Sequence, residues 1–141
     1  MSTVTIVHTF DTTPERVFAA WTEPAEIARW YGPQQFDAPD DRITVDLRPG
    51  GRWELTMVSR NGGGEFPIGY EILQVEPPGL LVMRSDPMPN LPQPTVVRVE
   101  IAADGAGARL TLTDGPMPEA GCAGAEAGYG AALDKLEAAL R

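Results

Sequence analysis

Residues 120–141 read AGCAGAEAGYGAALDKLEAALR and consist of two unlike halves. In the second half Leu133, Leu136 and Leu140 recur at spacings of three and four, which predicts a helix that packs one face on a core. In the first half only three residues, Cys122, Glu126 and Tyr129, are larger than alanine. The predicted inner face is therefore bulky at its C-terminal end and nearly bare at its start.

Helical geometry places one set of residues on a common face of this segment. At about 100° per residue they share an arc of about 80°, with Glu126 at its edge: Cys122, Ala125, Tyr129, Leu133, Leu136 and Leu140. Each glycine in the first half costs a helix about 1 kcal/mol relative to alanine. Two readings explain this composition equally well. Either the bare face leaves a hole above a sheet, or a close contact between helix and sheet requires small residues.

Composition indicates one soluble domain spanning residues 1–141. Hydrophobic residues make up 43% of the chain and the mean hydropathy is −0.17. No apolar run reaches the ~20 residues of a membrane span, so we expect no membrane insertion. The first residues lack the pattern of a secretory signal and a single cysteine excludes an internal disulfide, so we expect a cytoplasmic protein. The net charge of −9 would repel phosphate backbones, so we expect no nucleic-acid partner.

The order of predicted elements determines the fold class. Alternating apolar residues predict a strand over residues 3–10, and two short helices follow within residues 14–31. Further strands are predicted at 43–47, 52–60, 65–75, 80–85, 95–103 and 109–113, separated by turns rich in glycine and proline. A strongly bent antiparallel sheet around the C-terminal helix is the simplest α+β arrangement. Its apolar face would carry Trp53, Leu55, Met57, Phe66, Ile68, Tyr70, Ile72, Val97, Val99, Ile101, Leu110 and Leu112.

Five segments resemble a known family. They are FDTTPERVFAAWTEPAEIARWYGP (10–33), DLRPGGRWELTM (46–57), GYEILQVEPPGLLV (69–82), ARLTLT (108–113) and EAGYGAALDKLEAAL (126–140). Their order and spacing resemble the SRPBCC superfamily, also called START-like or pollen-allergen-like, and within it the branch of heat-shock-protein ATPase activator homologues. Tyr129 stands where such proteins usually carry tryptophan, which keeps an aromatic ring on the helix face.

The resemblance implies a helix-grip fold with a strongly curved antiparallel sheet of about six to seven strands. It also implies a deep apolar cavity between the sheet and the C-terminal helix, in which members bind hydrophobic small molecules. Members that activate the heat-shock ATPase carry a further N-terminal domain that is missing from this sequence. We therefore rank a role as a chaperone-regulator module third.

Few residues suit catalysis or metal binding. His8 is the only histidine and Cys122 the only cysteine, so the usual nitrogen and sulfur ligands of zinc or iron cannot be assembled, and we expect no metal. The two glycine-rich turns connect strands, unlike phosphate-binding loops, and we expect no cofactor. For Cys122 packing is favoured over nucleophilic chemistry. For His8 we favour a structural role.

Glu126 and Tyr129 remain as candidate catalytic residues. Burial would raise the pKa of Glu126 into the range useful for proton transfer, although solvent exposure is the favoured placement. Glu54, Glu71 and Arg84 would point inward only if a strand register were shifted by one residue. The candidate ligand-binding residues are Trp30, Trp53, Leu55, Met57, Phe66, Ile68, Tyr70, Met83, Cys122, Glu126 and Tyr129.

These observations favour a protein that binds a hydrophobic, ring-containing small molecule in a cavity between sheet and helix. The proline-rich segment 86–94 and the residues after Trp30 are candidates for its mouth. An enzyme of the cyclase, dehydratase or hydrolase type acting on a polyketide-like substrate is the second hypothesis. The sequence permits either a monomer or a homodimer.

Overall fold

The computed structural model describes residues 1–32, 35–87 and 93–140. Its strands are β1 (Ser2–Phe10), β2 (Phe36–Asp37), β3 (Ile43–Val45), β4 (Arg52–Ser59), β5 (Glu65–Glu76), β6 (Leu80–Ser85), β7 (Val96–Asp104) and β8 (Gly107–Met117). Its helices are α1 (Pro14–Thr22), α2 (Pro24–Ile27), the 3-10 turn η1 (Asp40–Arg42) and α3 (Glu119–Ala139). Among these residues no helix is long and apolar enough to cross a membrane.

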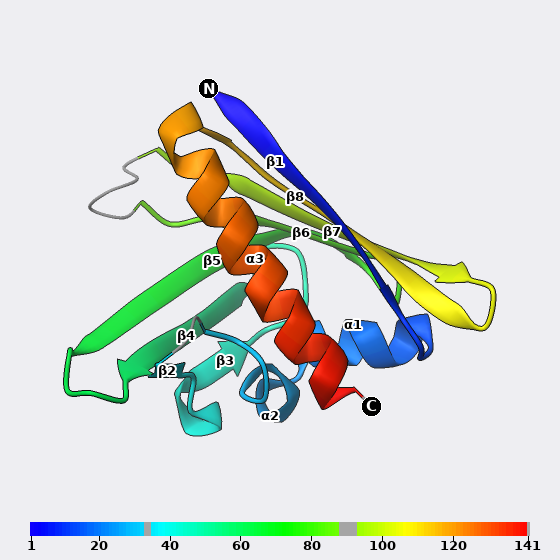
Figure 1. Ribbon diagram of the computed structural model, residues 1–141, viewed down its shortest axis with the longest axis horizontal. Helices are drawn as coiled ribbons and strands as arrows, with labels where there is room; N and C mark the ends of the chain where they lie inside the picture. Colours follow the sequence, from blue (N-terminus) through cyan, green and yellow to red (C-terminus); the bar gives the residue numbers. More distant parts are fainter. Residues whose placement is uncertain (33–34, 88–92, 141) are drawn as a thin grey trace.

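The strands form one open antiparallel sheet with the order β1-β8-β7-β6-β5-β4-β2, and β3 also pairs with β4. The sheet bends around α3, which runs diagonally across its concave face, while α1 and α2 lie near the C-terminal end of α3 (Figure 1). The predicted α+β helix-grip fold is confirmed, with eight strands. Strand β2 was not predicted because it contains only two residues in a mostly polar stretch.

Strand register confirms which residues share the apolar face. Trp53 pairs with Tyr70, and Leu55 pairs with Ile68, across β4 and β5. Side chains alternate along each strand, so these paired residues point to the same side of the sheet. On β7 and β8, Val99 pairs with Leu112 and is fully buried. The inner face of the sheet is therefore a continuous apolar surface.

Tryptophan side chains anchor the two short helices. Thr13 accepts a hydrogen bond from the Arg16 N–H at the start of α1, as an N-terminal cap does. At the end of α1, Trp53 Nε1 donates to the Trp21 carbonyl at 2.8 Å. Trp30 Nε1, just after α2, donates to the Ala20 carbonyl at 2.9 Å. These buried bonds fix the segment after α2 beside strand β4.

The two halves of α3 meet the sheet differently. Leu133 and Leu136 in the second half are fully buried. A Cβ atom built on Gly124, Gly128 or Gly130 would have no neighbouring atom within 4 Å, apart from the helix's own nearby backbone. The glycines therefore do not serve a close contact with the sheet, and that alternative reading of the sequence is wrong. Open space therefore lies beside these three glycines of the first half of α3.

Candidate ligand-binding site

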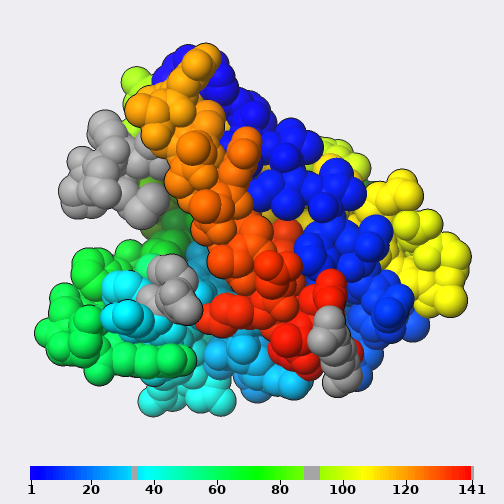
Figure 2. Space-filling model, viewed as in Figure 1, coloured from blue at the N-terminus to red at the C-terminus, as the bar shows by residue number. Residues whose placement is uncertain are grey.

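A pocket of about 220 Å³ lies between β4, β5, the segment around α2 and the first half of α3. It is lined by Trp21, Trp30, Tyr31, Gly32, Met57, Ile68, Ala125, Gly128, Tyr129 and Ala132. Figure 2 shows the surface hollowed between the orange part of α3 and the green strand β5. The pocket is partly open to solvent and its wall is mostly apolar.

The helix side of the pocket is made of small residues. Ala125, Gly128 and Ala132 recur at spacings of three and four, so they lie on one side of α3. Nothing lies within 4 Å of the position that a Cβ atom of Gly128 would occupy. The space beside α3 therefore exists because these residues have little or no side chain.

Aromatic rings form the opposite wall. The Trp21 and Trp30 ring centroids lie 4.8 Å apart, and those of Trp30 and Tyr31 lie 5.5 Å apart. Tyr31 meets Trp53 edge-on at 5.4 Å, and Trp53 meets Tyr70 edge-on at 5.5 Å. These separations fall in the favourable range for aromatic pairs. The rings form a contiguous cluster of tilted and edge-on pairs behind the pocket.

One end of the site is polar. The Tyr129 hydroxyl donates a hydrogen bond of 2.7 Å to Oδ2 of Asp114. Tyr31 and Tyr70 lie close enough to Tyr129 to affect its pKa, so the three tyrosines and Asp114 form one polar cluster. Asp114 is only 8% exposed and was missed in the sequence. The alternation of Leu110, Leu112 and Asp114 along β8 was the available signal.

Burial controls the protonation of the three tyrosines. Desolvation raises the pKa of Tyr31 to about 12, even though a hydrogen bond with Tyr70 lowers it. Burial also raises the pKa values of Tyr70 and Tyr129 well above their ordinary value, and the nearby Asp114 charge adds to the rise. All three hydroxyls therefore keep their protons at neutral pH.

Two buried polar atoms of this region lack a hydrogen-bond partner among the described residues, Trp21 Nε1 and Asp114 Oδ1. Trp21 lines the pocket and is 3% exposed. An unpartnered buried polar group costs about 1–3 kcal/mol. Trp21 Nε1 belongs to a residue of the pocket lining, whereas Asp114 lies behind Tyr129.

The structure brings together some of the predicted ligand-binding residues. Trp30, Met57, Ile68 and Tyr129 line the pocket. Trp53, Tyr70 and Met83 line a narrow gap of about 10 Å³, which shares Trp21, Tyr31 and Tyr129 with the pocket. The predicted set omitted Trp21, Tyr31, Gly32, Ala125, Gly128 and Ala132. Four of these are glycine or alanine, whose side chains are too small to indicate a site.

Other predicted residues lie away from the pocket lining. Leu55 is buried in the core, and Phe66 is 45% exposed and meets the ring of Phe36 edge-on. The Cys122 thiol lies 3.7 Å from the Pro118 carbonyl. Glu126 is exposed, as the sequence favoured. Of the two candidate catalytic residues, only Tyr129 therefore borders the pocket.

His8 contacts α3 near the C-terminal end of that helix. Its Nε2 lies 2.8 Å from Oε1 of Glu137. Its ring also lies near that of Phe10, with centroids 4.7 Å apart. His8 therefore joins strand β1 to the packed half of α3, away from the residues that line the pocket.

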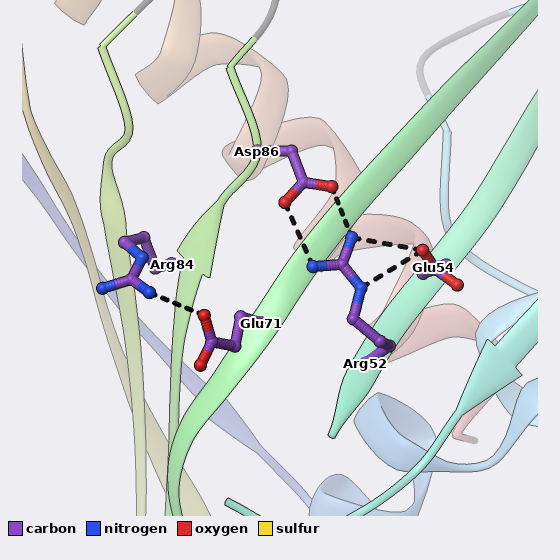
Figure 3. Close-up of polar contacts among 5 residues, drawn as sticks. All are labelled: Arg52, Glu54, Glu71, Arg84 and Asp86. Atoms are coloured by element: carbon purple, nitrogen blue, oxygen red, sulfur yellow. Dashed lines mark hydrogen bonds and ion pairs between the residues drawn. The ribbon is translucent and has the colours of Figure 1, made fainter. Parts of the chain in front are cut away.

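The charged side chains near the site lie on the outer face of the sheet. Arg52 of β4 binds Glu54 on its own strand and reaches across β5 to both carboxylate oxygens of Asp86, while Arg84 pairs with Glu71 (Figure 3). The register predicted from the sequence is correct for Glu54, Glu71 and Arg84, because none of them lines the pocket.

Arg52 and Asp86 meet directly above Gly69. A Cβ atom there would lie 2.5 Å from Asp86 Oδ2 and 2.7 Å from Arg52 Nη2, so the ion pair needs a residue without a side chain. This contact fixes the start of the proline-rich segment 86–94. Residues 88–92 of that predicted mouth, and residues 33–34 after Trp30, lie outside the described residues.

The described residues were also examined for groups of side chains that could hold a metal ion. Within residues 1–32, 35–87 and 93–140, no group of three or more His, Cys, Asp or Glu side chains is arranged to hold a metal ion. The described lining of the pocket consists of aromatic and apolar residues, and Asp114 lies behind it as the hydrogen-bond partner of Tyr129.

Comparisons with known proteins agree on the fold. A family model described as activator of Hsp90 ATPase homolog 1-like protein matches residues 11–141. A crystal structure from Chromobacterium violaceum has a TM-score of 0.87 at 22% identity, covering 96% of this chain and 94% of that one. An AHSA1 protein from Silicibacter pomeroyi has a TM-score of 0.84 at 23% identity, covering 99% and 97%. None of the curated proteins matches the chain.

Proposed function

Since the chain belongs to the activator of Hsp90 ATPase homolog 1-like family, whose fold commonly binds ligands, we propose that it binds a hydrophobic, ring-containing small molecule. The observation that carries this proposal is the pocket of about 220 Å³ between an aromatic wall and a glycine-bearing helix face. An apolar cavity of about 150 Å³ is enough to hold benzene. We therefore expect a ligand of one or two rings.

The pocket suits binding by burial. Covering about 150 Å² of ring surface contributes about 4 kcal/mol at about 25 cal/mol per Å². That free energy alone corresponds to an affinity of about 1 mM. The aromatic cluster is already held in place by Trp30 and Trp53, whose indole N–H groups donate to backbone carbonyls. Such preorganisation favours affinity, because little side-chain freedom is lost when the ligand enters.

We rank binding above catalysis because the candidate proton-transfer pair is not assembled. Glu126 is exposed and does not line the pocket, whereas Tyr129 does. Burial raises the pKa of Tyr129 well above its ordinary value, so its hydroxyl is a poor base at neutral pH. The enzyme hypothesis needs a carboxylate in the pocket wall, and the described lining contains none.

The proposal is tested by filling the pocket from the helix side. In Gly128→Leu the new side chain would occupy the space beside α3 and exclude the ligand. Gly124→Leu is the matched control, since its position also has no neighbouring atom within 4 Å but does not line the pocket. Both variants gain the same helix propensity, so a difference between them reports on the pocket.

Benzene, naphthalene and 2-naphthol serve as probes, with thermal unfolding and tryptophan fluorescence as readouts. Ligand at about 100 times its dissociation constant stabilises the native state by about 2.7 kcal/mol. We expect at least one probe to raise the melting temperature of the wild type and of Gly124→Leu but not of Gly128→Leu. Failure of all three probes to bind the wild type would contradict the proposal, and so would equal binding by the two variants.

A further inference from the structure

We propose that Lys135 sets the width of the pocket and thereby limits the size of the ring system that the pocket accepts. This inference rests on the proposed function and names a residue that determines its specificity. It follows from one hydrogen bond, in which the Lys135 ammonium group on α3 donates to the Gly32 carbonyl at 2.9 Å. Gly32 lines the pocket and belongs to the segment that follows α2.

The place of Lys135 on α3 lets its side chain reach across to the other part of the lining. Lys135 follows the lining residue Ala132 by three positions, so the two are neighbours on the helix surface. Its side chain is half-buried, and it is the only lysine in the sequence. A flexible stem of four carbons joins the ammonium group to the backbone. One unbranched side chain therefore bridges α3 and Gly32.

Gly32 depends on backbone contacts because it has no side chain with which to pack. Its φ of +106° lies in the left-handed region that favours glycine. The two rings before it are held by other contacts, since Trp30 Nε1 donates to the Ala20 carbonyl and the Tyr31 ring meets that of Trp53. Lys135 thus holds the part of the lining that comes after these rings.

A second cation joins the same two segments away from the pocket. Arg29 Nη2 donates to the Ala139 carbonyl at 2.7 Å, and α2 lies near the C-terminal end of α3 (Figure 1). Neither Arg29 nor Ala139 belongs to the described lining of the pocket. Both bonds run from a cation on one segment to a backbone carbonyl on the other. The Arg29 bond is therefore a matched control for the Lys135 bond.

The charge of Lys135 makes its bond suited to limiting the width of the pocket. A hydrogen bond from a charged donor is stronger than one between neutral groups. A ring system too wide for the space between α3 and Gly32 must displace Gly32 and break this bond. A smaller ring enters while the bond stays intact. Loss of the donor should therefore favour wide ligands over narrow ones.

Two probes with the same polar group and different widths test the inference. 2-Naphthol has two fused rings and 9-phenanthrol has three, and equilibrium dialysis gives the dissociation constant of each. The readout is the ratio of the two constants, because a partly unfolded variant weakens the binding of both probes by the same factor. Lys135→Met keeps an unbranched side chain without the donor, and we expect it to improve the relative affinity for 9-phenanthrol about tenfold.

Two further variants show whether the bond itself is responsible. Lys135→Arg retains a charged donor on a long stem, so the ratio should return towards the wild-type value. Arg29→Met removes the bond that lies away from the pocket and should leave the ratio unchanged. Binding of 2-naphthol by each variant also shows that it is folded.

The outcomes separate this inference from the function on which it rests. A wild-type ratio in Lys135→Met would overturn the role of Lys135 and leave the binding function standing. An equal change in Arg29→Met, or no return in Lys135→Arg, would also contradict it. Loss of both probes in Lys135→Met would assign the bond to the fold and not to the width of the pocket. The proposed function itself fails only if the wild type binds none of benzene, naphthalene and 2-naphthol.

Discussion

The two halves of α3 use the same helix for opposite purposes. In the second half Leu133 and Leu136 are fully buried against the sheet, whereas in the first half Gly124 and Gly128 have no neighbour within 4 Å of a Cβ position. Packed leucines stabilise the fold, while glycines in a helix reduce its stability. The difference teaches that the pocket depends on a segment of low intrinsic stability held in place by the well-packed segment that follows it.

The largest expected effect comes from the packed half. Leu136→Ala should reduce the free energy of unfolding by about 4 kcal/mol, because it removes a fully buried side chain and leaves a cavity. Urea unfolding followed by circular dichroism measures the loss. Ala132→Gly, in the lining of the pocket, is the comparison and should cost about 1 kcal/mol. Similar losses in both variants would contradict the division of α3 into a packed and an unpacked half.

Alkaline pH should act on Tyr31, which lines the pocket beside the glycine-bearing half of α3. Burial raises the pKa of Tyr31 to about 12 from an ordinary value of 10.0, so the native state holds its proton more strongly than the unfolded state. This contribution, about 3 kcal/mol, is fully present below pH 10 and is lost as the pH rises through 12. Unfolding in urea at about pH 8 and about pH 11 tests this dependence. Tyr31→Phe should depend less steeply on pH over that interval, and an equal slope would contradict the assignment.

The exposed glycine of the bare half allows a gain in stability. Gly124→Ala should raise the free energy of unfolding by about 1 kcal/mol, because alanine favours the helix and the new methyl group meets nothing within 4 Å. Thermal unfolding measures the gain. Gly69→Ala is the contrasting change, since its Cβ would collide with the Arg52–Asp86 ion pair. A loss of stability in Gly124→Ala would contradict the open space at position 124.

The smallest effect is expected where His8 meets the packed half. Glu137→Gln should lower the free energy of unfolding by less than about 1 kcal/mol, since the pair is partly exposed and glutamine can still bond to the ring. Chemical denaturation gives the value. A loss as large as that of Leu136→Ala would mean that the contact of β1 with α3, and not leucine packing, holds the helix on the sheet.

Most of the fold could be predicted from local pattern. The alternation in β4, β5, β7 and β8 is strict, so the inner face follows directly from residues such as Trp53, Ile68 and Leu112. The resemblance to the SRPBCC superfamily added the connection of these elements. Strand β8 was predicted to end at Thr113 but continues to Met117, because its last residues include Gly115 and Pro116, which rarely occur in strands.

The candidate site was harder to predict, because a pocket is defined by what is missing as well as by what is present. Large apolar residues such as Trp30 and Met57 are recognisable in the sequence, and the predicted ligand-binding set includes them. Gly128 and Ala132 line the space through their small size. Asp114 continues the buried alternation of Leu110 and Leu112, but an acidic residue is usually exposed and was therefore missed. Glu126 was a candidate because it lies at the edge of the predicted inner face, and it proved to be exposed. At such an edge a rotation of the helix by about one residue decides whether a side chain faces solvent or the interior.

The glycine at position 128 separates the size of the pocket from the packing of the core. Because nothing lies within 4 Å of a Cβ position there, a larger residue would reduce the volume of the pocket while the leucine-packed end of α3 and the sheet stay the same. One position can thus change the shape of the cavity without a change in the contacts that stabilise the fold.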